Sequence, residues 1–202
     1  MNILVVYYST FGHVFRLAGA VADGARSVAG TIVKLARVPE LIPEEIIRQN
    51  DGMLAGRELQ REVPIAEIAD LDWADGIAFG SPTRYGNMAA QMKNFLDQTG
   101  PLWAKGALEG KPATCFTSSN TMHGGQETTI VTMWVPLIHL GMVVLGVPYS
   151  TQELFATERG GSPYGASTVA GPDGSRQPTE TELTIARIQG KRLAEMAAKL
   201  RG

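Results

Sequence analysis

The sequence of 202 residues contains one cysteine, Cys115, so the chain cannot form an internal disulfide. Proteins of reducing compartments typically lack disulfides. The chain also lacks a charge excess, because 18 Lys and Arg residues stand against 20 Asp and Glu residues. Proteins that bind nucleic acid or anionic membranes usually carry a basic surface. We therefore expect neither partner.

A long hydrophobic run is also missing. The N-terminus has no positively charged segment and no small-residue cleavage site of the kind that marks a signal peptide. Its apolar run, residues 3–8, is far too short to span a bilayer. The sequence thus predicts a cytoplasmic protein without membrane insertion.

Two nucleotide-binding motifs are absent from the loop that follows this run, residues 9–14. The loop has no lysine, which a Walker A loop needs, and no G-x-G-x-x-G fingerprint. It offers the hydroxyls of Ser9 and Thr10, a glycine, and the free N–H groups of a helix start. This set is suited to one phosphate bound by neutral donors. An N-capping turn without a ligand uses the same residue types.

The pattern of apolar residues predicts an α/β fold. Runs rich in β-branched residues predict five strands, at residues 3–8, 31–38, 75–80, 113–118 and 142–149. Helical spacing predicts helices between them, at residues 14–28, 89–98 and 128–139, and a last helix that begins with a capping box from Thr179 to Glu182. Strands that alternate with helices form a doubly wound parallel sheet with helices on both faces.

Two segments interrupt this alternation in a chain that we expect to form one domain, residues 1–202. Residues 39–70 are polar and irregular, with three prolines and a predicted short helix near residues 44–49. Residues 158–177 form a loop rich in Gly, Ser and Pro. Long loops of this kind are usually functional or disordered.

Two further loops follow predicted strands and lie where ligands bind in open α/β sheets. Residues 82–87 contain Arg84 and Tyr85, which suit the wall of a pocket for a planar polar ring, but a surface turn uses similar residues. Residues 118–125 are polar and rich in backbone groups. They suit the opposite wall of such a pocket or a flexible connection.

Several motifs together resemble the WrbA family of flavodoxin-like NAD(P)H:quinone oxidoreductases. The similar segments are residues 8–13, 80–87, 95–103, 118–127 and 163–178. They occur in the family's order and spacing, and the resemblance covers essentially the whole chain. It implies a flavodoxin-like fold, FMN as cofactor, NADH or NADPH as co-substrate, quinones as electron acceptors, and a homotetramer with active sites near subunit contacts.

The resemblance also implies roles for particular residues. Phe11 matches a position that contacts nicotinamide, and Trp103 matches an aromatic residue on the quinone side, although packing in the core is its alternative. No residue is assigned a catalytic role, since the flavin is the reactive centre, and no metal is expected. The implied FMN-binding residues are Ser9, Thr10, Phe11, Gly12, His13, Val14, Thr83, Arg84, Tyr85, Gly86, Asn87, Ser118, Ser119, Asn120, Thr121, Met122, His123, Gly124 and His139.

Two other functions remain open from the sequence. One is a one-electron carrier flavodoxin, although such carriers tend to be strongly acidic and this chain is nearly neutral. The other is a non-catalytic flavin-binding partner of a regulatory protein. Neither the physiological quinone nor the choice between NADH and NADPH follows from the residues.

Overall fold

A computed structural model describes residues 1–201. Its sheet has the strand order β2-β1-β3-β5-β6, and all neighbours along this path are parallel. The strands are β1 (Asn2–Tyr7), β2 (Ile32–Arg37), β3 (Gly76–Arg84), β5 (Pro112–Ser119) and β6 (Val143–Val144). Two short strands, β4 (Asn87–Met88) and β7 (Ser167–Val169), join β3 and β5 outside this path. The predicted doubly wound parallel sheet is confirmed.

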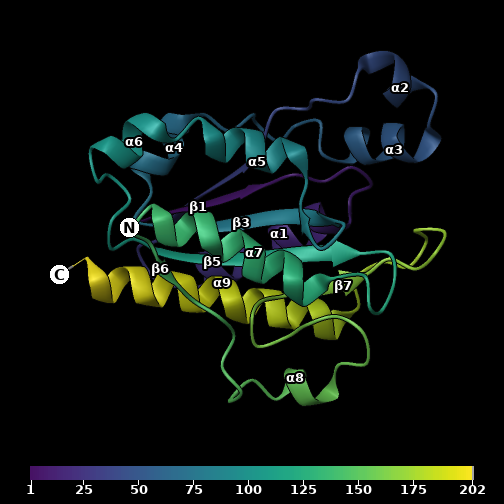
Figure 1. The fold of residues 1–202 in the computed structure, drawn as a ribbon. Helices are drawn as coiled ribbons and strands as arrows, with labels where there is room; N and C mark the ends of the chain where they lie inside the picture. The colour runs from purple at the N-terminus through teal and green to yellow at the C-terminus, as the bar shows by residue number, and fades with distance from the viewer. Residues whose placement is uncertain (202) are drawn as a thin grey trace.

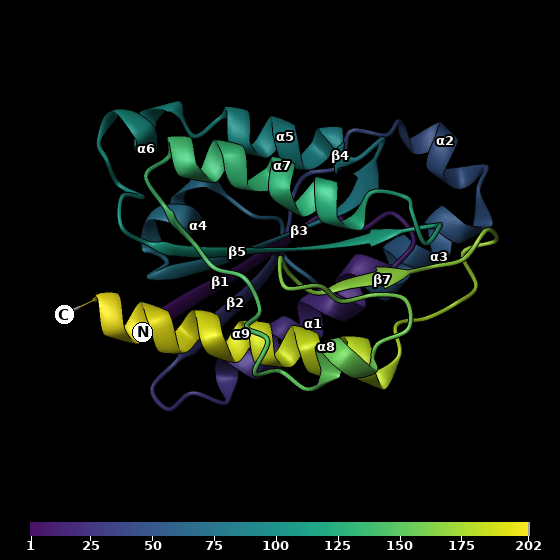
Figure 2. The same cartoon turned by 60° about the horizontal axis from the view of Figure 1, so that its bottom comes forward.

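Helices cover both faces of the sheet, as Figure 2 shows. On one face lie α4 (Ile68–Trp73), α5 (Ala90–Asp97), α6 (Gly100–Ala104) and α7 (Gln126–His139). On the other face lie α1 (His13–Arg26), α8 (Glu153–Ala156) and α9 (Glu180–Leu200). Each face has its own hydrophobic core.

The inner strand β1 is an unbroken apolar run because it contributes side chains to both cores. Successive side chains of a strand point to opposite faces. Leu4 and Val6 belong to the core beneath α5 and α7, whereas Ile3 and Val5 belong to the core beneath α1 and α9. A strand that is buried on both faces cannot alternate with polar residues.

The predicted fifth strand at residues 142–149 is wrong in extent. Only β6 is formed, and Leu145 adds one more bond to the ladder, from its N–H to the carbonyl of Ala113. The chain then leaves the sheet, and Val147 bonds instead to Pro163. The outer edge of β5 is completed by β7, whose Ser167 pairs with Thr117. This strand falls inside the segment that was predicted to be a loop, residues 158–177.

The segment at residues 39–70 contains more helix than predicted. The predicted short helix is confirmed as α2 (Glu44–Arg48), and α3 (Asp51–Leu59) follows it directly. The side chain of Asn50 caps α3 by accepting a bond from the N–H of Met53 at 3.0 Å. Figure 1 shows α2 and α3 beyond one end of the sheet, away from both chain termini.

Candidate active site

Three loops meet where β1, β3 and β5 end. These strands are neighbours in the sheet, so the loops that follow their carboxyl ends lie side by side. They border a cleft of about 820 Å³. The residues that line it are Ser9, Thr10, Phe11, His13, Val14, Asn50, Gly52, Ala55, Pro82, Thr83, Arg84, Tyr85, Ser118, Ser119, Asn120, Thr121, Gly124, Ala170, Pro172, Asp173 and Gly174.

The loop after β1 has the features of an anion site. Ser9 and Thr10 are buried, and the hydroxyl of Ser9 accepts a bond from the N–H of Gly12 at 3.1 Å. Helix α1 begins after Gly12 without a side-chain cap among residues 1–201, and its first turn contains no acidic residue. Its first N–H groups are therefore available to an anion, which the helix dipole also favours.

The loop after β3 is a tight hairpin. Arg84 pairs with Asn87 across the two-residue turn of Tyr85 and Gly86, and both turn residues have positive φ, 54° and 77°. This geometry suits a hairpin between twisted strands and explains the glycine. The Tyr85 side chain is fully exposed at the mouth of the cleft. Asn87 and Gly86 shape the hairpin and do not line the cleft.

Arg84 connects this hairpin to the first loop. Its Nη2 donates a hydrogen bond to Oγ1 of Thr10 at 3.2 Å, and its Nη1 donates to the carbonyl of Thr83 at 3.0 Å. A guanidinium group is thereby held beside the cleft. The position suits stabilisation of negative charge on a planar ring bound between the second and third loops.

The loop after β5 lies partly on the cleft and partly outside it. Ser118 and Ser119 are buried, and Oγ of Ser119 donates to the carbonyl of Thr121 at 2.8 Å. Gly124 lies against the hairpin, where its carbonyl accepts a bond from Oγ1 of Thr83 at 3.4 Å. Met122 and His123 point elsewhere and line a separate cavity of about 400 Å³.

Helix α3 forms a wall that sequence reasoning missed. Gly52 and Gly56 are four residues apart and so share one helix face. A Cβ at Gly56 would lie 2.3 Å from the carbonyl oxygen of Thr10, and one at Gly52 would lie 3.2 Å from the ring of Phe11. Only glycine allows this close approach. The G-x-x-x-G spacing is visible in the sequence, but nothing there shows that the first loop is its partner.

The start of the α2–α3 segment is anchored to the sheet. The Tyr8 hydroxyl donates to the Glu40 carboxylate at 3.0 Å. Gln91 on α5 donates to the same carboxylate at 2.8 Å. Burial raises the pKa of Tyr8, so the hydroxyl keeps its proton for this bond. Further along, Arg57 pairs with Glu44 and ties α3 to α2.

The other wall is residues 170–176, which we call the strap. The strap lies in the segment 158–177 that was expected to be a functional or disordered loop, but none of its residues was named as a site residue. Ala170, Pro172, Asp173 and Gly174 line the cleft, as do Gly52 and Ala55 of α3. The strap is held by Arg176, whose Nη2 donates to the buried carboxylate of Glu182 at 2.9 Å.

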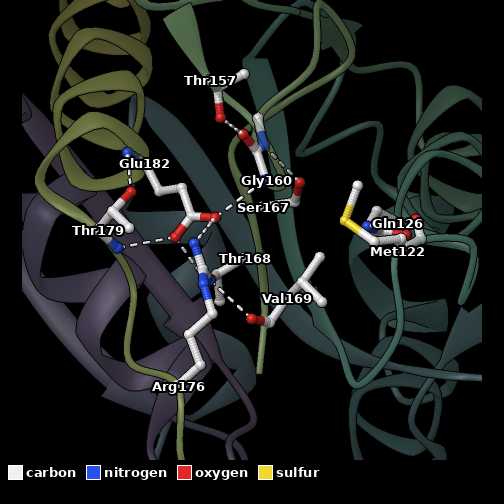
Figure 3. A network of polar contacts seen from close by, with 11 residues as sticks. Met122, Gln126, Thr157, Gly160, Ser167, Thr168, Val169, Arg176, Thr179 and Glu182 are labelled. Carbon is white, nitrogen blue, oxygen red and sulfur yellow. Dashed lines mark hydrogen bonds and ion pairs between the residues drawn. The ribbon is translucent and has the colours of Figure 1, made fainter. Parts of the chain in front are cut away.

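Glu182 links three parts of the chain through one carboxylate (Figure 3). It accepts bonds from the N–H of Thr179 at 2.8 Å, the N–H of Gly160 at 2.9 Å and the hydroxyl of Thr168 at 2.9 Å. The predicted capping box of α9 is thus confirmed, and its glutamate has a second role. It fixes the strap and β7 to the start of α9.

Two predicted site residues lie far from this cleft within one chain. Trp103 on α6 is 64% exposed. His139, also exposed, ends α7. Figure 2 places α6 and the end of α7 at the opposite end of the sheet from α2 and α3. Their predicted contacts with substrate and flavin therefore require a second copy of the chain. The exposure of Trp103 contradicts its alternative placement in the core.

Other reactive groups are unsuited to covalent or metal chemistry. Cys115 is fully buried in β5, and burial raises the pKa of its thiol, which keeps the sulfur un-ionised and unreactive. Residues 1–201 contain no cluster of three His, Cys, Asp or Glu side chains that would hold a metal. They also contain no helix long and apolar enough to cross a membrane.

The residues present fit FMN. The first loop provides neutral donors for one phosphate, and Nε2 of His13 is buried beside it without a hydrogen-bond partner among residues 1–201. The second and third loops provide two walls of the same cleft. Together these features define a flavodoxin-like protein with a mononucleotide cleft at the carboxyl ends of its strands.

Comparison with known proteins agrees with this class. The family model described as NADPH-dependent FMN reductase matches residues 1–155, and the chain belongs to that family. It is 51% identical to a protein named NAD(P)H dehydrogenase (quinone) from Aromatoleum aromaticum, over 99% of this chain and 97% of that protein. A protein of the same name from Trichlorobacter lovleyi is 52% identical, over 98% of each chain.

Solved structures show the same fold. The WrbA-like flavodoxin from Agrobacterium tumefaciens superposes with a TM-score of 0.65 at 24% identity, covering 98% of each chain. A flavodoxin from the domain Archaea superposes with a TM-score of 0.61 at 21% identity over the whole of both chains. These structures confirm the predicted flavodoxin-like fold, and the sequence relatives confirm the predicted relationship to NAD(P)H:quinone oxidoreductases.

Proposed function

We propose that this protein is an FMN-dependent oxidoreductase that transfers two electrons from NADH or NADPH to quinones. The observation that carries the proposal is the cleft at the ends of β1, β3 and β5, with an anion site of neutral donors at one end and an open mouth beside Arg84. Support comes from relatives named NAD(P)H dehydrogenase (quinone), which are about 50% identical over their full length.

In this proposal the protein binds and orients FMN and the two substrates, and bound FMN would supply the two-electron chemistry between them. The loop of Ser9 to Val14 binds the phosphate. Residues Thr83 to Tyr85, with Ser118 to Thr121 and Gly124, hold the ring, and Arg84 stabilises negative charge on it. Met122 and His123, which line the separate cavity, take no part. Phe11, 47% exposed in the cleft, offers an apolar face for the nicotinamide. The two substrates use the same open mouth in turn.

The direct test is spectroscopic. Purified protein with FMN should show a flavin absorbance that NADH or NADPH bleaches and benzoquinone restores, with ping-pong kinetics. A carrier flavodoxin would instead accept electrons singly and show little turnover with nicotinamide nucleotide and quinone. Reductive titration distinguishes the two, because an enzyme of the proposed kind is reduced in a single two-electron step.

We also propose that the protein is a cytoplasmic homotetramer with D2 symmetry, the common closed arrangement of four identical chains. The proposal rests on the WrbA resemblance and on the exposed position of Trp103, distant from its own cleft. Sedimentation of the FMN-bound protein at micromolar concentration should give the mass of four chains, and a monomer would contradict it.

A further inference from the structure

The buried imidazole of His13 has one nitrogen, Nε2, that the fold leaves unsatisfied within residues 1–201. His13 is the first residue of α1, is 6% exposed and lines the cleft. Its Nε2 has no hydrogen-bond partner in the described part of the chain, residues 1–201. An orphaned buried nitrogen costs free energy unless a ligand supplies its partner.

The first loop has no other cationic group. It contains no lysine or arginine, and Arg84 reaches it from the ring end of the cleft by way of Thr10. Arg16 lies on α1 outside the cleft lining. Within this loop, a phosphate dianion bound at the start of α1 would therefore meet neutral donors and one titratable side chain, His13.

The surroundings of His13 keep it neutral when no anion is present. Burial lowers its pKa, and the charges of Arg16 on α1 and Arg176 on the strap lower it further. The backbone carbonyls of Gly174 and Arg176 act in the opposite direction without reversing the shift. Asp173 also lines the cleft, and its charge would favour a protonated ring, while the charge of Arg176 is balanced by Glu182.

We propose that His13 is the countercharge for the FMN phosphate: when the phosphate binds at the start of α1, the imidazole takes up one proton from solvent and donates a hydrogen bond to a phosphate oxygen. This rests on the proposed function, since it concerns the same cofactor. No covalent bond forms or breaks. The proton comes from the buffer and returns to it when FMN leaves.

The proposal fixes the sign of a pH effect. Above pH 6.5 the neutral imidazole dominates in the free protein, and the phosphate, whose second pKa is about 6, is largely a dianion. Binding then consumes a proton. FMN affinity should fall as the pH rises toward the pKa of His13 in the complex, by up to roughly tenfold per pH unit. Riboflavin lacks the phosphate, so its affinity should not follow this dependence.

Calorimetry in two buffers of different ionisation enthalpy counts the protons. At pH 7.5, FMN binding to the wild-type protein should take up close to one proton after correction for the titration of the phosphate itself, since a single site takes up about one proton at most. Riboflavin binding should take up none. His13→Gln should lose the uptake and weaken FMN binding without weakening riboflavin binding. Equal proton counts for wild type and His13→Gln would overturn the proposal.

A second measurement tests the proposal even if the His13→Gln variant does not fold. NMR titration of the imidazole signals in the wild-type protein follows each of its three histidines. His123→Gln and His139→Gln each remove one signal and so assign the third. FMN should raise the pKa of His13, and riboflavin should not. An unchanged pKa with FMN bound would contradict the proposal, whereas failure of FMN to bind would instead overturn the proposed function.

Discussion

In the first loop, residues 9–14, uncharged side chains hold the backbone in a fixed shape. Ser9 and Thr10 are buried, and their hydroxyls already bond to the Gly12 N–H and to Arg84. These bonds fix the loop in shape before any ligand arrives, so binding costs little ordering. The sequence alone predicted this loop as an anion site or an N-capping turn. The structure favours the anion site, because neither hydroxyl caps α1 within residues 1–201.

Replacing Ser9 and Thr10 together by alanine should weaken FMN binding by about 1–3 kcal/mol for each charge-assisted hydrogen bond lost. The strand and helix on either side are unchanged, so the melting temperature of the apoprotein should fall little. Fluorescence titration of FMN gives the affinity, and riboflavin serves as the control ligand. An FMN affinity within error of wild type would mean that the phosphate binds elsewhere.

Gly56 should be intolerant of even one methyl group. The Cβ of Gly56→Ala would lie 2.3 Å from the Thr10 carbonyl oxygen and 2.9 Å from Cα of Phe11. Either α3 or the loop must move, at a cost of about 1–3 kcal/mol in the free energy of unfolding, and FMN affinity should fall with it. Urea unfolding and FMN titration measure the two effects.

Gly19→Ala is the matched control for this substitution. Gly19 is also helical, and nothing in the described chain lies within 4 Å of an added Cβ. Alanine there should stabilise α1 by about 0.5–1 kcal/mol. Equal changes in the free energy of unfolding and in FMN affinity for the two variants would show that α3 does not pack closely against the first loop.

At the scale of elements, the sequence predicts the strands and helices that have a regular pattern of apolar residues. It misses the elements that are formed through contacts with distant parts of the chain. The strands β1, β3 and β5 were predicted from apolar runs because each is buried on both faces. The edge strand β2 is only partly buried, but its apolar residues were enough to predict it. The fifth strand was misplaced because two short pieces, β6 and β7, share the edge of β5. Neither piece is long enough to carry a periodic signal. The helix α3 was missed because its face toward the first loop includes Gly52 and Gly56, which contribute nothing to a hydrophobic period.

The hydrogen bonds of Glu182 join β7 and the strap to α9, and their loss should lower the free energy of unfolding. Glu182→Gln keeps the shape but replaces an acceptor oxygen by a donor among groups that all donate. The charge of Arg176 would also lose its partner. We expect a loss of about 3–5 kcal/mol in the free energy of unfolding, the range for a broken buried ion pair. Strap residues 170–176 should become more open to proteolysis and hydrogen exchange.

Glu195→Gln provides the comparison on the same helix. Glu195 is exposed and lies 3.8 Å from Lys191, so its loss should cost less than about 1 kcal/mol. Denaturant unfolding of both variants measures the difference. Comparable losses would mean that Glu182 does not hold the strap in place.

At the scale of the whole molecule, the predicted site residues lie in two places, at the cleft and at the opposite end of the sheet. The cleft residues come from strand ends, where the topology of any doubly wound sheet places ligands. Trp103 and His139 lie at the other end, and no property of one chain brings them to the cleft. Their roles came from the family resemblance, and the geometry makes those roles conditional on assembly.

Trp103→Ala tests this assembly. Because Trp103 is 64% exposed, its removal should not cost the 3–5 kcal/mol of stability typical of a core aromatic. If the indole stacks on quinone in another copy's cleft, a contact worth about 0.5–1.5 kcal/mol, quinone reduction should slow while FMN affinity and reduction of the flavin by NADH stay unchanged. Stopped-flow measurement of the two half-reactions separates these effects.

Mixed oligomers make the test decisive. Subunits with Trp103→Ala keep the FMN loop intact, and subunits with Ser9 and Thr10 replaced by alanine keep the tryptophan. Refolding the two together should create sites in which FMN on the first chain meets Trp103 of the second. Quinone turnover per bound FMN should then rise above that of Trp103→Ala alone. A mixture no more active than its separate components would show that Trp103 does not act on a neighbouring site.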